Sequence, residues 1–141
     1  MADWVETARG VVFPWLCDHF GHLSARNYLD WFDDGGFHIW TLVGVSHKEM
    51  RERGIAIVVA RFTINYVHEL KAGDLLVVKG AFTKVGTKSI ATLQKMYNAD
   101  TNELAATMES AEVFFDPKTR TSAPMPEDIR ARLLPHVVVV A

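Results

Sequence analysis

One long helix-forming segment followed by four long strand-forming segments most constrains how this 141-residue chain can fold. From about Ala25 to Leu42, apolar residues recur at the three- and four-residue spacing of a helix with one buried face. After Gly54 the pattern changes to that of β-strands, over residues 55–67, 75–85, 88–98 and 103–115. Segments of about ten residues or more exceed the usual strand length, and a strongly curved sheet wrapped around one helix would need them. We therefore predict an α+β fold.

Shorter segments complete the predicted architecture. Residues 5–15 predict a first strand, and turn-forming residues between the four later strands predict an antiparallel meander. Residues 126–134 predict a surface helix, because acidic residues come early and basic residues late. The run Val137–Val140 is far too short to span a bilayer, and it predicts an extended tail or an added strand at a sheet edge.

The long helix carries its own local signals. Ser24 is a candidate N-cap. Gly35 and Gly36 each disfavour a helix by about 1 kcal/mol relative to alanine, so we expect close packing of the helix on the sheet there. Ser46 and Glu49 stand in capping-box register and predict a short connecting helix.

Composition predicts one globular domain over residues 1–141, because 49% of the residues are hydrophobic and no Pro/Gly/Ser-rich or charge-rich stretch divides them. A net charge of −2, with scattered basic residues, gives no footprint for nucleic acid or an anionic membrane. The single cysteine, Cys17, excludes an intrachain disulfide. The N-terminus lacks the layout of a secretion signal, so the expected location is the cytoplasm.

The segment Asp18–His22 (DHFGH) carries the strongest chemical signal, because it puts a carboxylate just before the predicted helix. A carboxylate can attack or activate water, and the first N–H groups of a helix can stabilise an oxyanion, so the pair predicts acyl transfer. The neighbouring Trp15, Leu16 and Phe20 are expected to desolvate Asp18 in part. The plain alternative is a loop aspartate that caps a turn through its own side chain.

Three features together resemble a known family. They are Asp18–His22, Asn27-Tyr28 with Trp31-Phe32, and the turn Lys71–Asp74 (KAGD) between two long strands. Over about residues 7–134 the chain resembles the hotdog-fold acyl-CoA thioesterases of the 4-hydroxybenzoyl-CoA thioesterase-like superfamily. The resemblance implies a long central helix wrapped by a curved antiparallel sheet of about five strands.

The same resemblance implies roles for individual residues. Asp18 would be the catalytic nucleophile or general base, and His22 a second catalytic candidate. The backbone N–H groups near Ala25 and Arg26 would polarise the thioester carbonyl. The implied substrate is an acyl-CoA, the implied assembly is a homodimer or homotetramer, and neither a metal nor a cofactor is needed. The family often has an acidic residue two positions before the catalytic one, and this chain has Leu16 there.

Further residues are candidates for contacts with substrate. Asn27, Tyr28 and Trp31 fall in the first turns of the predicted helix, and Arg61, Lys84 and Lys88 could meet the phosphates of coenzyme A. Aromatic residues of the helix could also enclose a short, bulky or quaternary-ammonium acyl group, as the resemblance to betainyl-CoA thioesterases around Asp18–His22 suggests. The carboxylates of Asp33-Asp34 and of Glu109 and Glu112 are interpreted as solvated or salt-bridged faces.

Two other functions stay open. A hotdog dehydratase or hydratase would use a histidine and a carboxylate to move a proton beside the thioester carbonyl. A non-catalytic acyl-CoA-binding protein would keep the fold without the chemistry. No two of the six histidines stand at zinc-ligand spacing with a third ligand nearby, so metal dependence is not expected.

Overall fold

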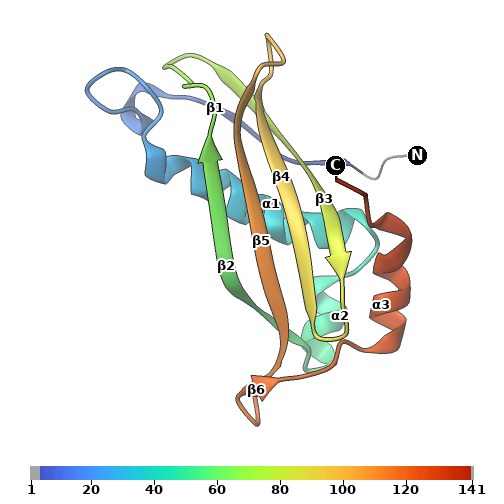
Figure 1. Cartoon of the computed structure of the whole chain (residues 1–141). Helices are drawn as coiled ribbons and strands as arrows, with labels where there is room; N and C mark the ends of the chain where they lie inside the picture. The colour runs from blue at the N-terminus through green and yellow to red at the C-terminus, as the bar shows by residue number, and fades with distance from the viewer. Residues whose placement is uncertain (1–3, 141) are drawn as a thin grey trace.

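The computed structural model of the chain describes residues 4–140. One long helix lies against one face of a curved antiparallel sheet, and two short helices sit at one end of it (Figure 1). The elements are β1 (Val5–Val11), α1 (Tyr28–Leu42), α2 (His47–Glu52), β2 (Ala56–Tyr66), β3 (Leu75–Val85), β4 (Ser89–Asn98), β5 (Leu104–Asp116), β6 (Thr121–Ser122) and α3 (Glu127–Leu133). This is the predicted α+β hotdog arrangement.

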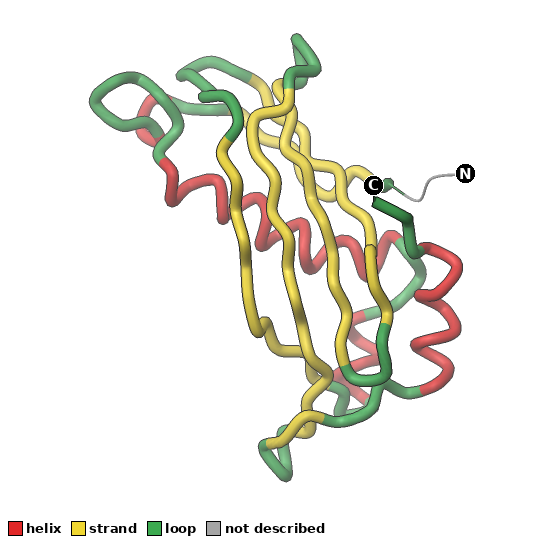
Figure 2. The backbone as a smooth tube through the Cα atoms, viewed as in Figure 1, coloured by secondary structure: helices red, strands yellow, loops and turns green. Residues whose placement is uncertain are grey.

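The strands follow the order β1-β3-β4-β5-β2, all antiparallel, and β6 adds a short pairing to β5 (Figure 2). The predicted meander is therefore right for β3, β4 and β5 and wrong for β2. Strand β2 does not pair with β3, because β1 occupies that edge; it pairs with β5 instead, from Ala56 opposite Phe115 to Tyr66 opposite Ala106. As a result, β2 lies at a free edge of the sheet.

Helix α1 begins later than the sequence indicates. A 3₁₀ turn over Ala25–Asn27 leads into it, and Ser24 occupies the cap position of this turn without a side-chain hydrogen bond. The helix buries a stripe that faces the sheet and ends before Gly44, which has a φ of +87°. The buried residues of α1 are Tyr28, Phe32, Gly35, Ile39 and Trp40.

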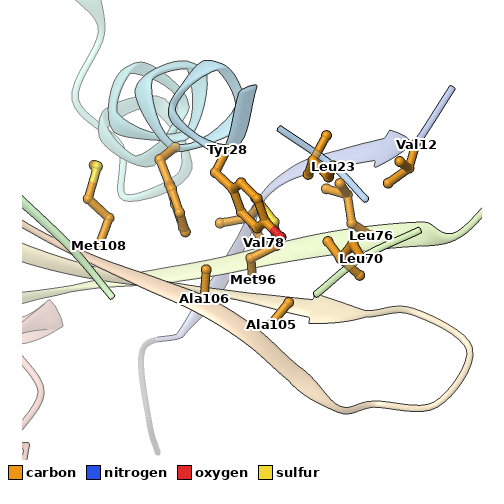
Figure 3. Close-up of a cluster of buried hydrophobic side chains, with 11 residues drawn as sticks. Val12, Leu23, Tyr28, Leu70, Leu76, Val78, Met96, Ala105, Ala106 and Met108 are labelled. Atoms are coloured by element: carbon orange, nitrogen blue, oxygen red, sulfur yellow. The ribbon is translucent and has the colours of Figure 1, made fainter. Parts of the chain in front are cut away.

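The core divides into two clusters along α1. Under its first half, Tyr28 points toward the sheet among apolar side chains of β3, β4 and β5, including Val78, Met96 and Ala106 (Figure 3). Under its second half, Trp40 packs edge-on against Phe82 and Phe114. Side chains of α2 and α3 also pack into this second cluster. Together the two clusters fill the space between α1 and the sheet.

The two adjacent glycines of α1 differ in their surroundings. A Cβ on Gly35 would lie 2.1 Å from Oε1 of Gln94 and 2.8 Å from Oγ1 of Thr7, so the expected close approach to the sheet is confirmed. A Cβ on Gly36 would meet nothing within 4 Å, so the same expectation is wrong there. Gly36 instead lines a cavity, described below.

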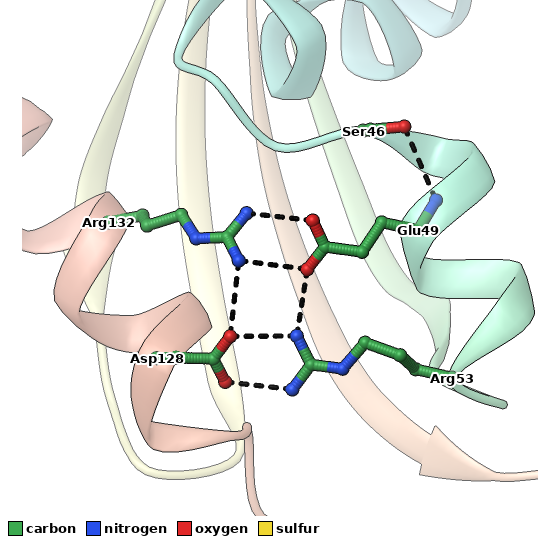
Figure 4. A network of polar contacts seen from close by, with 5 residues as sticks. All are labelled: Ser46, Glu49, Arg53, Asp128 and Arg132. Atoms are coloured by element: carbon green, nitrogen blue, oxygen red, sulfur yellow. Dashed lines mark hydrogen bonds and ion pairs between the residues drawn. The ribbon is translucent and has the colours of Figure 1, made fainter.

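Four charged side chains join α2 to α3 (Figure 4). Arg53 donates to Asp128 at 2.7 and 2.8 Å, and Arg132 donates to Glu49 at 2.8 and 3.1 Å. Ser46 accepts a hydrogen bond from the Glu49 backbone N–H, so half of the predicted capping box forms, while the Glu49 carboxylate turns to the arginines instead. These ion pairs fix the two short helices to each other.

The C-terminal valines bear out the expected sheet-edge pairing in part. Val137 forms an isolated parallel bridge to Phe82, and the N–H of Val138 donates to the Phe82 carbonyl at 2.9 Å. The pairing extends along β3 beyond the end of β1 without forming a named strand.

Candidate active site

The loop between β1 and α1 holds the carboxylate of Asp18 in a fixed orientation. Its Oδ1 accepts hydrogen bonds from the backbone N–H of Phe20 at 2.9 Å and of His22 at 3.3 Å. The backbone of Asp18 also pairs with that of His22, and Gly21 has a φ of +80°, which closes the turn. The turn-capping interpretation is therefore correct for Oδ1. Oδ2 has no hydrogen bond within residues 4–140 and is free for chemistry.

The side chains beside Asp18 do not desolvate it in the single chain. Trp15 is 75% exposed and Phe20 is 72% exposed, and the carboxylate itself is exposed. The expectation of a partly desolvated carboxylate is thus wrong for one protomer, because the loop bulges away from the sheet. The loop instead presents an aromatic surface, on which the rings of Phe13 and Trp15 stack with centroids 4.6 Å apart.

The start of the helical segment supplies free donors near this carboxylate. The backbone N–H groups of Ala25 and Arg26 find no acceptor among the described residues, as expected for the first residues of a helical turn. The side chain of Asn27 donates to the Leu16 carbonyl at 2.7 Å and so ties the helix start to the Asp18 loop. Asn27 therefore has a structural contact and supports the positions of both elements.

A cavity opens beside Asp18, and we call it the Asp18 cavity. Two tyrosines form one wall of it. Tyr28 is buried, and this burial raises the pKa of its phenol. Tyr66, from the end of β2, packs edge-on against Tyr28 and donates to the Ala25 carbonyl at 2.9 Å. Sequence reasoning missed Tyr66, since it follows the predicted helix start by 41 residues. The cavity is lined by Asp18, His22, Leu23, Ala25, Tyr28, Tyr66, Val67, His68 and Glu69.

His22 holds Asp18 through its backbone, while its ring points elsewhere. The Nε2 atom lies 3.8 Å from Oε1 of Glu69, and the ring stacks loosely with Phe20 at a centroid distance of 6.3 Å. His22 and Asp18 do line the same cavity. The imidazole is therefore available to a bound substrate, and within residues 4–140 only the backbone N–H of His22, not its ring, bonds to the Asp18 carboxylate.

Other candidate residues lie away from the Asp18 cavity. Trp31 lies against Gly10 of β1, where a Cβ would come within 2.4 Å of the indole Nε1. Arg61 lines a hollow with Thr83 and Glu109, which is a different surface. Lys84 is exposed on β3 and Lys88 lies in the β3–β4 turn, so one protomer does not bring the three basic residues to Asp18.

A second cavity of about 290 Å³ opens between α1, α2, β2 and β5, and we call it the aromatic cavity. Its wall combines rings, aliphatic side chains and two carboxylates. It is lined by Phe32, Asp33, Gly36, Phe37, Trp40, His47, Met50, Arg51, Ile55, Ile57, Val59, Phe62, Gln94, Met108, Ser110 and Glu112.

Glu112 corrects the interpretation of the carboxylate pairs. It alternates in phase with the buried Met108, Ser110 and Phe114, so it faces α1, whereas Glu109 is exposed on the other side of β5. The two glutamates share no site, as expected. Glu112 is half-buried instead of fully solvated, and no ion pair reaches it within residues 4–140; this burial raises the pKa of its carboxyl to about 7. The alternation of residues 106–114 in the sequence could have indicated that Glu112 lies on the buried face of its strand.

Residues 4–140 contain neither a metal-binding cluster nor a membrane-spanning helix. No group of three or more His, Cys, Asp or Glu side chains there is arranged to hold a metal ion. No helix of this part of the chain is long and apolar enough to cross a membrane.

The sequence matches the family model of the thioesterase-like superfamily over residues 11–133. The chain belongs to this superfamily. The matched range includes the Asp18 loop, α1 and the strands β2 to β5, but only the last residue of β1. The thioesterase-like resemblance stated from the sequence is thereby confirmed.

Two curated relatives are L-carnitine dehydrogenase/betainyl-CoA thioesterases. The protein from Rhizobium meliloti (strain 1021) is 25% identical over 118 residues, which cover 84% of this chain and 24% of the relative. The protein from Rhizobium sp is 26% identical over 116 residues, which cover 82% of this chain and 23% of the relative. This superfamily member thus spans about a quarter of the length of these two-function proteins.

Solved structures share the fold. A Staphylococcus aureus protein determined in complex with coenzyme A has a TM-score of 0.85 at 21% identity, covering 100% of this chain and 90% of that one. A 1,4-dihydroxy-2-naphthoyl-CoA thioesterase from Synechocystis has a TM-score of 0.77 at 16% identity, covering 90% of this chain and 93% of that one. The two TM-scores over nearly the whole chain show that it shares the fold of these proteins, and the predicted hotdog fold is confirmed.

Proposed function

We propose that this thioesterase-like protein hydrolyses an acyl-CoA thioester to a carboxylic acid and coenzyme A, with Asp18 as the reacting carboxylate. The observation that carries the proposal is the pairing of a held carboxylate with free donors in one cavity. Oδ1 of Asp18 is anchored by two backbone N–H groups, Oδ2 is free, and the unpaired N–H groups of Ala25 and Arg26 begin the adjacent helical turn.

The proposed reaction uses these groups in sequence. Oδ2 either attacks the thioester carbonyl carbon or removes a proton from the water that attacks it. Negative charge then develops on the carbonyl oxygen, which the N–H groups of Ala25 and Arg26 stabilise; one such donor is worth about 3–4 kcal/mol in acyl transfer. The C–S bond breaks, coenzyme A leaves as a thiolate and takes up a proton. In the nucleophilic route, water then hydrolyses the mixed anhydride on Asp18.

A second copy of the chain would complete the site. Strand β2 is an unpaired edge of 11 residues that exposes Val58 at 42% and Val59 at 46%, and long apolar edges of this kind pair with other strands. We propose a homodimer in which β2 pairs antiparallel with its symmetry mate. The exposed Trp15 and Phe20, on the loop that carries Asp18, would then also pack against the second protomer.

This pairing would bring the two cavities together across the interface. With the symmetry axis at Arg61, the midpoint of β2, Tyr66 would lie opposite the partner's Ala56. Tyr66 lines the Asp18 cavity, and the residues flanking position 56 line the aromatic cavity. Asp18 of one protomer would therefore face the aromatic cavity of the other, which would enclose the acyl group and remove water from the carboxylate.

Coenzyme A is the proposed carrier. The curated relatives are named for betainyl-CoA, and the Staphylococcus aureus protein was solved with coenzyme A. Positive charge near the Asp18 cavity comes from the exposed Arg26 and Lys71, the latter in an isolated bridge with His22. These two join Arg61, Lys84 and Lys88 as candidate phosphate contacts.

Free-thiol release from a panel of short, branched, aromatic and cationic acyl-CoAs tests the proposed function. A thioesterase releases one thiol for each acyl-CoA consumed. Turnover of enoyl- or 3-hydroxyacyl-CoA without thiol release would instead indicate a hydratase or dehydratase. Stabilisation by acyl-CoA with no turnover at all would indicate a binding protein and would contradict the proposal.

A further inference from the structure

We propose that the aromatic cavity is a cation site: it takes a compact acyl group that ends in a positively charged, alkylated ammonium, held among aromatic rings beside Asp33 and Glu112. The inference deepens the proposed thioesterase function and rests on it for the attachment of that group to coenzyme A. It assigns a substrate class and two specificity-determining residues that the Asp18 chemistry does not use.

The charge of the cavity wall favours a cation. Glu112 projects from β5 toward α1, and its one hydrogen-bond partner among the described residues is the Ser110 hydroxyl, at 3.4 Å from Oε2. The charged group that acts on it is Asp33 of α1, which has the same sign. Burial and this like charge both raise the pKa of the Glu112 carboxyl, to about 7. A positive group between the two carboxylates would stabilise the ionised form of Glu112 against both burial and the repulsion from Asp33.

The remaining charged or titratable groups of the cavity come from α2. His47 is already engaged, since its Nε2 lies 2.7 Å from the Phe37 carbonyl oxygen. Arg51 is exposed and is not among the groups that shift the Glu112 carboxyl. The inward residues of β2 that line the cavity are apolar, and those of β4 and β5 besides Glu112 are uncharged. Within residues 4–140, no basic side chain forms an ion pair with Asp33 or Glu112.

The rings supply the second part of the recognition. Phe32, Phe37, Trp40 and Phe62 all line the cavity, and the faces of such rings attract cations and are used by proteins to recognise quaternary ammonium groups. A volume of about 290 Å³ is at the lower end for small-molecule sites, so a compact head group fits better than a long acyl chain. Gly36 keeps the mouth open, because a side chain there would project into the cavity.

Competing acyl classes fit this wall less well. An anionic acyl group would meet two carboxylates, and the basic side chain of the wall, Arg51, is exposed. A neutral aliphatic group would fill the aromatic part but would leave the half-buried Glu112 with the Ser110 hydroxyl as its hydrogen-bond partner among the described residues. The cationic class makes use of both the rings and the carboxylates of the wall.

The proposal predicts a specific link between binding and protonation. A cation binds better when Glu112 is ionised, so binding expels a proton from the fraction of molecules in which it is protonated. The value of kcat/KM for a cationic substrate should therefore rise with pH through about 7, relative to a neutral substrate of the same shape. Both substrates undergo the same reaction at Asp18, so effects of pH on that shared chemistry cancel in the ratio.

Two isosteric substrates test the proposal: trimethylammonioacetyl-CoA and 3,3-dimethylbutanoyl-CoA, which replaces the quaternary nitrogen by carbon. The wild type should prefer the cation by about tenfold or more in kcat/KM, as a desolvated cation–π and carboxylate contact requires. Glu112→Gln and Asp33→Asn should each reduce this preference, because kcat/KM for the cationic substrate falls more than kcat/KM for the neutral one. Glu112→Gln should also abolish the pH dependence of the ratio.

Matched control variants distinguish a cation site at Glu112 and Asp33 from a general effect of the protein's charge on the substrate preference. Glu109→Gln removes the same charge from the opposite face of β5 and should leave the preference unchanged. His47→Gln should keep the pH dependence, since Glu112 rather than His47 carries it. Equal or better hydrolysis of the neutral isostere by the wild type would overturn the cation site and leave the thioesterase function intact.

If the proposed thioesterase function is wrong, the cation site can still be tested by binding alone. If neither substrate releases thiol, calorimetric titration with tetramethylammonium chloride in two buffers of different ionisation enthalpy decides the cation site alone. Binding with proton release that Glu112→Gln removes would support the site. Absence of binding, or binding unchanged in Glu112→Gln, would overturn it.

Discussion

Nδ2 of Asn27 donates a hydrogen bond of 2.7 Å to the carbonyl oxygen of Leu16, two residues before Asp18. This contact joins the two parts that the proposed chemistry must keep in register: the loop that carries the carboxylate and the turn that carries the free N–H groups. Because 11 residues separate Asn27 from Leu16, the pairing is a property of the folded loop.

Asn27→Ala should lower kcat more than it changes KM, since a misplaced carboxylate loses transition-state contacts that the bound substrate does not need. We expect a fall in kcat of about tenfold or more, with a stability loss of about 1 kcal/mol for the lost hydrogen bond. Steady-state kinetics and denaturant unfolding measure both. Asp34→Asn, on the exposed side of α1, is the control; an unchanged kcat in Asn27→Ala would remove the positioning role.

The two glycines of α1 should respond oppositely to alanine. Gly35→Ala forces a methyl group against Gln94 and Thr7 and should destabilise the protein by about 1–3 kcal/mol. Gly36→Ala meets open space and should stabilise the helix by up to about 1 kcal/mol. Thermal and denaturant unfolding of the two variants check this, and equal effects would contradict the packing described here.

Ion pairs between α2 and α3 should make stability depend on acid pH. Hydrogen bonds from the arginines hold the pKa of the Asp128 and Glu49 carboxyls below their ordinary values, so both carboxyls bind protons more weakly in the folded protein than in the unfolded one. Their contribution is present above the unfolded pKa values and is lost as pH falls through the folded ones. The pairs are partly exposed, so added salt should weaken them.

Asp128→Asn should therefore lower Tm at pH 7, and its difference from the wild type should shrink steadily as pH falls from about 5 to 2. Differential scanning calorimetry over this range measures the effect. Glu127→Gln, at the neighbouring exposed position, should show a smaller difference at every pH. A gap between Asp128→Asn and wild type that stays constant down to pH 2 would contradict the assignment.

The β2 edge should control assembly. Lysines on edge strands oppose strand pairing, so combining Val58→Lys with Val59→Lys should convert the proposed dimer to a monomer. Val11→Lys, on the other edge strand β1, is the matched control and should leave the dimer intact. Light scattering coupled to size-exclusion chromatography gives the mass directly. A monomeric wild type would overturn the proposed dimer.

Local patterns were enough to predict most elements and the Asp18 loop. The bounds of β3 agree with the expected 75–85, because alternation and turn residues are read from neighbours in the chain. The place of β2 beside β5 could not be predicted, since it depends on β1 taking the edge of β3. For the same reason the approach of Tyr66 to Ala25 left no sequence signal.

Asp18 and Glu112 illustrate the limit on site residues. A motif marks Asp18, but its exposure in the single chain depends on a loop path that the flanking Trp15 and Phe20 did not reveal. Glu112 carried a readable signal, because its side of β5 alternates with Met108 and Phe114. Because glutamate is usually solvated, the sequence alone favoured an exposed position for it. Its partial burial results from the packing of α1 against the sheet, which is a tertiary contact.

Thiol release by Asp18→Asn compared with wild type is the most direct test of the central claim. The amide oxygen of asparagine can still accept hydrogen bonds from the N–H groups of Phe20 and His22, so the loop should keep its shape while the charge is lost. With Asp30→Asn as a control on the first turn of α1, we predict a fall in kcat of at least about a hundredfold for Asp18→Asn alone, with an unchanged Tm. Turnover in Asp18→Asn at the wild-type rate would contradict the claim that this carboxylate carries the reaction.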